Sequence, residues 1–470
     1  MTRFLISAAH KSSGKTSVSI GLCAALARQG LVVQPFKKGP DYIDPLWLGR
    51  AAGRACRNLD FQVQTHDEIT AQFARHAGGA DVALVEGNKG LYDGLDLEGS
   101  NSNAALAHLL DLPVVLVLDT RGTIRGVAPL LLGYRQFDPR LRFAGVILNF
   151  VGGARHEAKL RAVIEHYTDF PVLGALPRDD SLTITERHLG LVPANEAEAA
   201  DARIAALADR VTACVDLAAL RQRCTAPPLP PAPPAAPPPV DDAPVRIAIA
   251  RDRAFGFYYQ DDLDALTAAG AELVPFDTLH DRTLPEVDGL FIGGGFPETS
   301  LQALAANAPL RAALRAAIED GLPTYAECGG LMYLARKLHW RGQSGDMVGV
   351  IPAEVQMEAR PVGRGYVHLR ETGLGPWPLP PSDGDGASFH AHEFHYSRLV
   401  GLPDGLTYAY RVERGYGIDG HHDGLVLHNL LASYAHLRDV AGNHWTRRFV
   451  AHVRRCRAAA RRPHPQGDCA

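Results

Sequence analysis

The stretch FLISAAHKSSGKTSVSIGLCAAL, residues 4–26, joins two apolar segments through a loop of small and basic residues. The run from Phe4 to Ala9 predicts a buried strand, and the apolar residues between Val18 and Leu26 predict a helix. Strand, loop and helix in this order begin a parallel α/β sheet, in which ligands bind beyond the carboxyl ends of the strands. The stretch therefore indicates both the fold of the N-terminal half and the place of its ligand.

The loop AAHKSSGKT, residues 8–16, has the composition of a phosphate-binding loop. Small residues let consecutive backbone N–H groups surround phosphate oxygens, Lys15 adds positive charge, and the Thr16 hydroxyl can ligate magnesium. Ala9 stands where the first glycine is usual, and His10 stands where the deviant loops of partition-type ATPases carry a lysine. We predict that the nucleotide is bound by Lys11, Ser12, Ser13, Gly14, Lys15 and Thr16.

Further apolar runs alternate with helix-length segments through this half of the chain. The predicted strands span residues 4–9, 31–36, 82–86, 114–119 and 143–149. Continuous apolar strands of this kind predict a doubly wound α/β domain with a mostly parallel sheet. Asn149 ends the last strand, and it is either a reader of the nucleotide base or a simple strand-ending asparagine.

Two charged clusters follow later strands, in PFKKGPDYIDP (residues 35–45) and VEGNKGLYDG (residues 85–94). Magnesium bound to a triphosphate prefers hard oxygen ligands, so Thr16, Asp41 and Glu86 are the predicted ligands. The alternative for the aspartates of the first cluster is a role in the turn and the helix cap. Lys37 and Lys38 are either surface charges or partners of an anionic substrate or the γ-phosphate.

Composition limits the classes of protein that this chain can represent. Of its 470 residues 46% are hydrophobic and 21% are charged, as in soluble globular proteins, and a net charge of −4 gives no argument for nucleic acid or a membrane as partner. Seven scattered cysteines without a CxxC pair argue against a disulfide framework and a structural zinc site. With no visible signal peptide and no long apolar stretch, we expect a cytoplasmic protein.

A proline-alanine tract, CTAPPLPPAPPAAPPPVDDAP over residues 224–244, divides the chain. Such a tract forms neither helix nor sheet and acts as a semi-rigid spacer, although it could instead be a ligand for a proline-binding module. The predicted parts are therefore an N-terminal domain over 1–223, the linker over 224–244, a second domain over 245–460 and a disordered tail over 461–470.

The second domain repeats the α/β pattern and carries a candidate nucleophile. Predicted strands span 246–250, 272–275 and 289–292, and YAECGG (residues 325–330) places Cys328 between a short strand and a helix. A sharp strand-to-helix turn exposes a nucleophile, needs glycine beside it, and offers N–H groups to an oxyanion. The alternative is a buried core cysteine.

Two further features support a nucleophile at this position. The triple glycine at 293–295 follows a predicted strand, so the N–H groups of Gly294, Gly295 and Gly329 are the predicted oxyanion hole; a tight turn is the alternative. His436, late in the chain, is the candidate base. His392, Glu393 and His395 form a competing cluster of candidate residues. Their segment alternates like a strand and does not have the HExxH order of a zinc-binding motif.

Together, these motifs resemble the cobyrinic acid a,c-diamide synthase family. The resemblance rests on the GKT loop, PFKKGPDYIDP, VEGNKGLYDG, ERHLGLVPANE, DRAFGFYY, GGGFPE, YAECGGLMYL and HEFHYS, and covers nearly the whole chain except the linker and tail. It implies a dethiobiotin-synthetase-like ATP domain with a parallel sheet, fused to a flavodoxin-like class I glutaminase domain. It also implies glutamine-dependent, ATP-dependent amidation of acetate side chains of a corrin-type macrocycle through an acyl phosphate.

The same resemblance assigns roles to single residues. It implies that Cys328 is the glutaminase nucleophile and His436 its base. It places Asp41, Tyr42, Asp44, Glu86 and Asp93 in the synthetase motifs. With Lys37 and Lys38 from the strand end, the residues predicted for substrate binding and phosphoryl transfer are Lys37, Lys38, Asp41, Tyr42, Asp44 and Asp93. Typical class I glutaminases carry a glutamate two residues after the histidine, where this chain has Arg438, so a Cys-His dyad is expected.

The resemblance leaves the substrate open. Asn88 and Lys89 replace a more usual apolar pair, and a branch similar to this family is associated with siroheme amidation. The alternatives are therefore a siroheme amidase of sulfur metabolism and a hydrogenobyrinic acid a,c-diamide synthase, with a partition-type ATPase or a stand-alone glutaminase more distant. The expected ligands are ATP, Mg²⁺, glutamine and a tetrapyrrole, and a homodimer is one assembly that the sequence allows.

Overall fold

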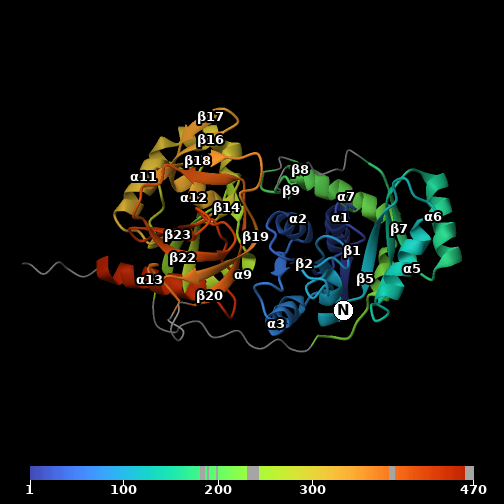
Figure 1. The fold of residues 1–470 in the computed structure, drawn as a ribbon. Coiled ribbons are helices and arrows are strands. Elements are labelled where there is room, and N and C mark those ends of the chain that lie inside the picture. The colour runs from blue at the N-terminus through green and yellow to red at the C-terminus, as the bar shows by residue number, and fades with distance from the viewer. Residues whose placement is uncertain (180–185, 188–189, 197–198, 230–242, 380–386, 461–470) are drawn as a thin grey trace, which may run out of the picture. The chain divides into compact units, whose positions relative to one another are not determined.

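The computed structural model describes residues 1–179, 186–187, 190–196, 199–229, 243–379 and 387–460 (Figure 1). The chain divides into two compact units, Met1–Pro234 and Ala235–Ala470. The division falls within the proline tract, most of which lies outside the described residues, as do the predicted tail over 461–470 and part of the ERHLGLVPANE motif. The predicted domain boundaries therefore stay a prediction.

The sheet of the N-terminal unit is parallel throughout, in the order β3-β2-β4-β1-β5-β6-β7. Its strands are β1(Thr2–Ala8), β2(Val33–Lys38), β3(Arg57–Leu59), β4(Val82–Glu86), β5(Val114–Asp119), β6(Phe143–Val151) and β7(Val172–Pro177). Every residue of β1, β2 and β4 is buried, as a sheet covered on both faces requires. The carboxyl ends of these three strands carry the loop and the two charged clusters.

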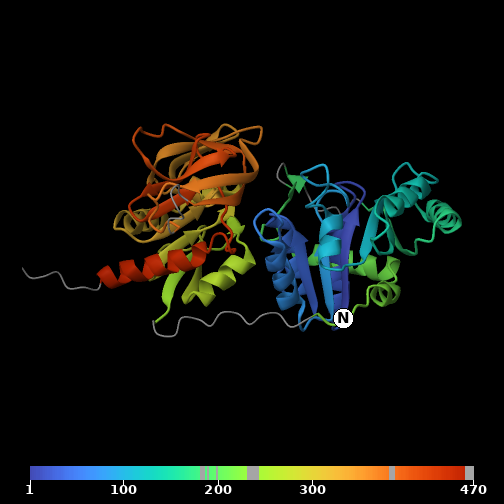
Figure 2. The same cartoon turned by 60° about the horizontal axis from the view of Figure 1, so that its bottom comes forward.

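Helices cover both faces of this sheet (Figure 2). They are α1(Lys15–Arg28), α2(Ile43–Ala52), α3(His66–Ala77), α4(Asn103–Leu109), α5(Val127–Phe137), α6(Ala154–Tyr167), α7(Ala200–Cys214) and α8(Leu217–Arg223). Helix α1 packs against α2 and α7, whereas α5 packs against α6. The short strands β8(Glu186–Arg187) and β9(Gly190–Leu191) pair antiparallel.

The C-terminal unit contains a mixed nine-stranded sheet, in the order β12-β10-β13-β15-β24-β23-β22-β19-β20. The parallel strands are β10(Val245–Ala250), β12(Ala271–Phe276), β13(Gly289–Ile292), β15(Thr324–Glu327) and β24(Leu430–Ser433). The antiparallel extension consists of β19(Gly363–Glu371), β20(Ser388–His395), β22(Thr407–Arg414) and β23(His422–Leu427). The predicted α/β class is confirmed for both units.

Smaller elements surround this sheet. The helices are α9(Gln260–Ala268), the 3₁₀ helix η2(Pro297–Ser300), α10(Leu301–Ala306), α11(Ala308–Glu319), α12(Gly329–Leu334) and α13(Trp445–Ala460). A four-stranded sheet contains β16(Ala335–Trp340), β17(Gln343–Asp346), β18(Ile351–Met357) and β21(Ser397–Val400), and β11(Phe255–Phe257) pairs with β14(Gly294–Gly295). The predictions contain no element for β16 to β19, because glycines and charged residues interrupt the apolar pattern of these strands.

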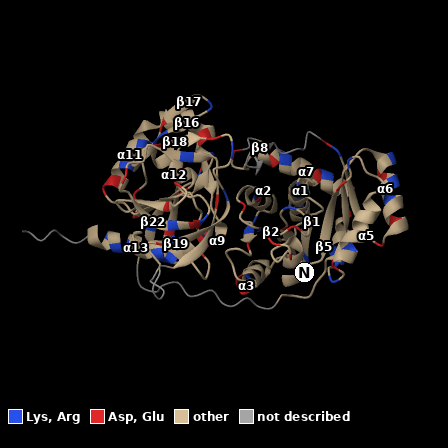
Figure 3. Cartoon of the chain, viewed as in Figure 1, with Lys and Arg blue, Asp and Glu red and all other residues tan. Residues whose placement is uncertain are grey.

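Figure 3 shows acidic and basic residues interspersed along surface helices such as α6, α7 and α11. Helix α13 differs, because its sequence contains five arginines and no acidic residue.

Candidate active sites

The phosphate-binding loop lies between β1 and α1, and its geometry requires a glycine. Gly14 has a φ of 84°, in the left-handed region, and a Cβ atom there would lie 2.1 Å from Nδ2 of Asn149. The same Nδ2 donates a hydrogen bond of 2.9 Å to the carbonyl oxygen of Ser13. Asn149, near the carboxyl end of β6, therefore supports the backbone of the loop through this hydrogen bond. Its role in reading a nucleotide base stays a prediction.

The ammonium group of Lys15 lies against main-chain carbonyls. Its Nζ donates to the carbonyl oxygen of Lys89 at 2.7 Å and to that of His10 at 3.3 Å. Burial, and after it the positive charge of Lys37, lowers the pKa of Lys15 to about 8. A phosphate group in the loop would raise this pKa again, because an anion stabilises a buried ammonium.

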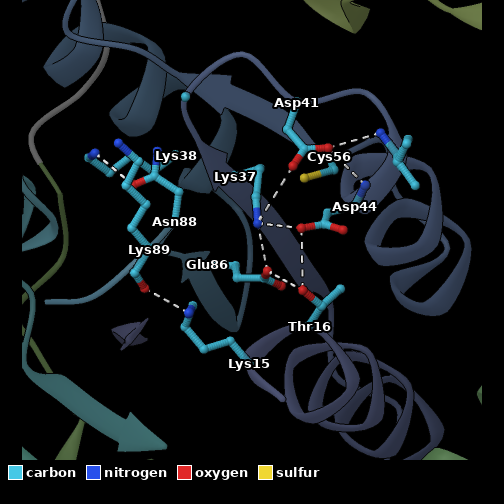
Figure 4. A network of polar contacts seen from close by, with 12 residues as sticks. Lys15, Thr16, Lys37, Lys38, Asp41, Asp44, Cys56, Glu86, Asn88 and Lys89 are labelled. Carbon is cyan, nitrogen blue, oxygen red and sulfur yellow. Dashed lines mark hydrogen bonds and ion pairs between the residues drawn. The ribbon is translucent and has the colours of Figure 1, made fainter. Parts of the chain in front are cut away.

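A buried network joins the loop to the ends of β2 and β4 (Figure 4). Nζ of Lys37 lies 2.5 Å from Oδ2 of Asp44 and 2.6 Å from Oε1 of Glu86. The hydroxyl of Thr16 donates to the same two oxygens, at 3.3 and 2.8 Å respectively. The structure thus brings together four residues that the sequence places in three separate motifs.

Asp41 mainly supports the start of α2. Its Oδ1 accepts hydrogen bonds from the backbone N–H groups of Ile43 and Asp44, at 2.9 and 3.0 Å. Its Oδ2 is 3.8 Å from Nζ of Lys37, and burial, followed by the charge of Asp44, raises the pKa of Asp41 to about 7. The turn role that the sequence suggested for Asp41 is therefore present, and Asp44 is the aspartate nearer to Thr16.

The donor set of this network fits magnesium. Oε2 of Glu86 is buried and accepts no hydrogen bond from the described residues, while Thr16 and Asp44 supply further oxygens beside it. Among the described residues, His, Cys, Asp and Glu side chains form no complete metal site by themselves. Mg²⁺ binds proteins through one or two carboxylates together with substrate phosphates and water, and this network supplies two carboxylates and one hydroxyl.

The second charged cluster lies beside this network. Nζ of Lys38 donates to Oδ1 of Asn88 at 3.0 Å, and burial lowers the pKa of Lys38 to about 8. Oδ2 of Asp93 accepts from the backbone N–H of Gly90, which shapes the loop after β4. Tyr42 occupies the N-cap position of α2. The predicted substrate residues therefore lie along two adjacent strand ends.

A cavity of about 480 Å³ lies beside the loop and the two charged clusters. The loop and cluster residues that line it include Lys11, Ser12, Gly14, Lys15, Thr16, Lys37, Asp44 and Glu86. The lining also contains apolar residues, namely Phe150, Leu176, Pro177, Leu207 and Val211, and the ion pair of Asp179 and Arg210. A cavity that combines anion-binding groups with apolar walls has the character of a nucleotide site.

Cys328 occupies the turn between β15 and α12, as the sequence predicted for its position. Its φ is 46° and its ψ is −100°, a conformation that is rare for a residue with a side chain. The side chain is 8% exposed, and a Cβ at Gly330 would lie 2.2 Å from the carbonyl oxygen of Ile292. The strained turn and the glycine beside it are typical of a nucleophile elbow.

His436 lies beside Cys328 and is almost fully buried. Although burial opposes its charged form, hydrogen bonds to Cys328 and Glu327 and the negative charge of both raise the pKa of His436 to about 10. Its backbone N–H donates to the carbonyl of His392 at 2.7 Å, where the His392 ring has its pKa lowered by burial to about 3. A cysteine and a positively charged histidine in contact have the arrangement of a thiolate nucleophile and its acid–base partner.

The glycines of the predicted oxyanion hole lie against this pair. A Cβ at Gly294 would meet Cε1 of His436 at 2.7 Å, and one at Gly329 would meet the backbone nitrogen of Gly295 at 2.9 Å. The triple glycine forms part of a short strand, β14, rather than only a tight turn. Its small residues allow the backbone, the histidine ring and the cysteine turn to approach one another.

Two other charged residues noted in the sequence, Glu393 and Arg438, have structural partners. Glu393, in β20, accepts hydrogen bonds from the backbone N–H groups of Tyr416 and Gly417 at 2.7 and 2.8 Å. Arg438 is buried, lies within 4 Å of Asp261 and Asp262, and covers the ring of Tyr259. The position after His436 where a glutamate is usual is therefore occupied by an arginine with other partners.

Sequence reasoning missed one carboxylate near the candidate base. Oε2 of Glu327 lies 3.3 Å from Nδ1 of His436. Glu327 is directly before Cys328, and no motif spacing marks it as a partner of a residue 109 positions later. Only the pairing of β15 with β24 brings the two segments together.

Comparisons with known proteins agree with these two sites. Residues 5–192 match the CobQ/CobB/MinD/ParA nucleotide binding domain, and residues 246–442 match the CobB/CobQ-like glutamine amidotransferase domain. The chain is 47% identical to a cobyrinate a,c-diamide synthase of Magnetococcus marinus, across 98% of this chain and 99% of that protein. The chain belongs to the cobyrinate a,c-diamide synthase family.

Other members of the family are similar along most of their length. The enzyme of Methanosarcina acetivorans is 40% identical over 93% of each chain, and that of Archaeoglobus fulgidus is 40% identical over 95% of this chain and 96% of its own. As a member of this synthase family, the protein is a nucleotide-binding ligase that uses glutamine as amide donor. In the described residues, no helix has the length and apolar character needed to cross a membrane.

Proposed function

We propose that this protein amidates the a and c acetate carboxylates of cobyrinic acid, with ATP as the activating cosubstrate and glutamine as the nitrogen source. The observation that carries the proposal is the combination, in one chain, of a nucleotide cavity and a Cys328–His436 pair with near full-length similarity to cobyrinate a,c-diamide synthases. The phosphate-binding loop and both charged clusters beside the cavity lie within one matched domain, and the cysteine lies within the other.

The N-terminal unit would activate the carboxylate. A carboxylate oxygen attacks the γ-phosphorus of ATP, ADP leaves, and an acyl phosphate forms. Loop N–H groups and Lys15 hold the phosphates, and Lys37 neutralises charge that develops during transfer. Thr16, Asp44 and Glu86 would hold magnesium, which screens the phosphate oxygens when bound. Lys38, which donates to Asn88, would bind the carboxylate of the macrocycle.

The C-terminal unit would release ammonia. The Cys328 thiolate attacks the side-chain amide carbon of glutamine, and the N–H groups of Gly295 and Gly329 stabilise the oxyanion. Protonated His436 gives its proton to the leaving nitrogen, so that ammonia departs and a thioester remains. His436 then accepts a proton from the water that cleaves the thioester to glutamate. Ammonia attacks the acyl phosphate and displaces inorganic phosphate.

Mass spectrometry of the products tests the proposal. Protein is incubated with ATP, magnesium and glutamine together with cobyrinic acid, hydrogenobyrinic acid or siroheme, each in a separate reaction. The expected result is replacement of two carboxyl groups by amides on cobyrinic acid. Amidation of siroheme alone, in line with the Asn88–Lys89 pair, or of hydrogenobyrinic acid alone would overturn the substrate assignment in favour of that alternative.

The Cys328→Ala variant distinguishes the two half-reactions. We expect glutamine-dependent amidation to fall by at least about 10³-fold, because the nucleophile is absent, while amidation with ammonium chloride persists. Cys456→Ala, at a partly exposed cysteine of α13, is the matched control and should retain both activities. Loss of the ammonia-dependent reaction in Cys328→Ala would contradict the division of labour between the two units.

A further inference from the structure

The imidazole of His436 needs a group that fixes its orientation. In a cysteine-histidine pair, a third residue bound to the second ring nitrogen selects the tautomer and stabilises the imidazolium. Arg438, two residues later, cannot accept a hydrogen bond and is engaged with Asp261 and Asp262. An acceptor for Nδ1 of His436 must therefore come from another element.

We propose that Glu327 is this positioning residue, so that Glu327, Cys328 and His436 act as a catalytic unit in which the carboxylate precedes the nucleophile. The proposal rests on the glutamine-hydrolysing half of the proposed function and does not depend on the identity of the tetrapyrrole. It assigns to Glu327 the orientation of the histidine ring, not contact with glutamine.

The contacts of Glu327 hold its carboxylate firmly. The residue is 3% exposed, and its Oε1 accepts from the backbone N–H of Leu437 at 3.0 Å and from the hydroxyl of Tyr325 at 2.7 Å. Its Oε2 is left to face Nδ1 of His436 at 3.3 Å. One oxygen is thus fixed by the chain next to the histidine, and the other is directed at the ring.

The local backbone geometry explains how the residue directly before the nucleophile can orient the ring of His436. Successive residues of a strand point to opposite faces, so Tyr325 and Glu327 share one face of β15. The chain then turns sharply at Cys328, whose positive φ carries the nucleophile out of the strand. Two adjacent residues can therefore contact the same imidazole from different directions. Glu327 faces Nδ1, and Cys328 lies on the side of the active site.

Among the described residues, Glu327 is the carboxylate that contacts the ring of His436. The titratable groups that face the ring from the packed elements are Glu327 in β15, Cys328 at the start of α12 and His392 in β20. Asp423, in β23, is close in the fold, but its oxygens accept from the backbone N–H groups of Tyr434 and Ala435. The raised pKa of His436 agrees with a carboxylate that stabilises the imidazolium.

The test uses the full chain with Glu327→Gln, which keeps the side-chain shape and removes the charge. Release of glutamate from glutamine is measured against pH without any tetrapyrrole, so that failure of the substrate assignment cannot affect the result. We expect kcat to fall by about 10²-fold with little change in KM, since a correctly oriented acid–base group contributes on this scale. The alkaline limb of the pH profile should move to lower pH, because His436 loses the charge that favours its protonated form.

Two further variants separate positioning from support of the fold. Tyr325→Phe removes one hydrogen bond to Oε1 but keeps the carboxylate, so its alkaline limb should stay in place. Glu327→Asp keeps the negative charge, so we expect a kcat between those of Glu327→Gln and the wild type, with the alkaline limb of the pH profile at the wild-type position. It is also the variant to measure if Glu327→Gln does not fold. Iodoacetamide labelling of Cys328 reports that the site is intact.

Two outcomes would overturn the proposal. One is an unchanged kcat in a folded Glu327→Gln protein, and the other is a lower kcat with the same pH profile, which indicates a structural role only. If Glu327→Gln does not fold, a folded Glu327→Asp protein with the wild-type kcat would equally overturn the proposal, because a carboxylate one methylene shorter no longer lies at the same distance from Nδ1 of His436.

Discussion

Lys37 shows how one buried cation supports both the fold and the proposed chemistry. It is 5% exposed and neutralises Asp44 and Glu86, each within 2.6 Å. Replacing it with methionine leaves two buried carboxylates without a counterion, and removing one partner of such a network costs about 3–5 kcal/mol. We therefore expect Lys37→Met to lower the free energy of unfolding by this amount and to abolish amidation with either nitrogen donor.

Lys38→Met is the matched control for this experiment in denaturant unfolding. Lys38 donates to the neutral side chain of Asn88, so its loss should destabilise the protein by about 1–3 kcal/mol at most. Magnesium added without nucleotide should recover part of the lost stability in Lys37→Met, because the two carboxylates then have a cation. Equal losses in the two variants would contradict the central role of Lys37.

His436 predicts a pH dependence of stability. Its pKa is about 10 in the folded protein and 6.5 in an ordinary environment, so protonation favours the folded state. This contribution is complete below pH 6.5 and is lost as the pH rises through 10. In thermal unfolding, the advantage of the wild type over His436→Gln should be largest near pH 6 and should shrink toward pH 10. A difference that does not vary with pH would be inconsistent with this assignment.

At the scale of elements, strand β14 must remain free of side chains on its active-site face. A Cβ at Gly294 would approach the His436 ring to 2.7 Å, so Gly294→Ala should displace the histidine and lower glutaminase kcat by about 10²-fold. Ammonia-dependent amidation should not change. Gly442→Ala, where an added Cβ meets no atom within 4 Å, is the control and should behave like wild type.

The observed strands also show which elements the sequence patterns predict and which they do not. Strands β4, β5 and β13 have the predicted bounds, because continuous apolar runs bounded by polar residues define them. β3 was outside the predictions because it has only three residues. The antiparallel extension of the second sheet depends on pairings between residues far apart in the chain, which periodicity alone does not reveal.

For the whole molecule, the proposed function predicts that nitrogen from glutamine reaches the acyl phosphate before it equilibrates with solvent. Free ammonia is mostly protonated at neutral pH and is then not a nucleophile. With unlabelled glutamine and ¹⁵N-ammonium chloride at pH 7, we expect the amide product to contain mainly unlabelled nitrogen, measured by mass spectrometry. Product that carries the isotope ratio of the bulk ammonia pool would show that the released ammonia escapes first.

The sequence by itself determined the α/β class of both units, the position of the GKT loop and the strand-to-helix turn at Cys328, because these depend on local periodicity and on glycines at set positions. Tertiary structure decided which side chains meet. It placed Asp44 beside Thr16 and Glu86, and brought Glu327 to His436 across 109 residues. Parallel pairing aligns the ends of strands that are distant in sequence, and no local pattern contains that information.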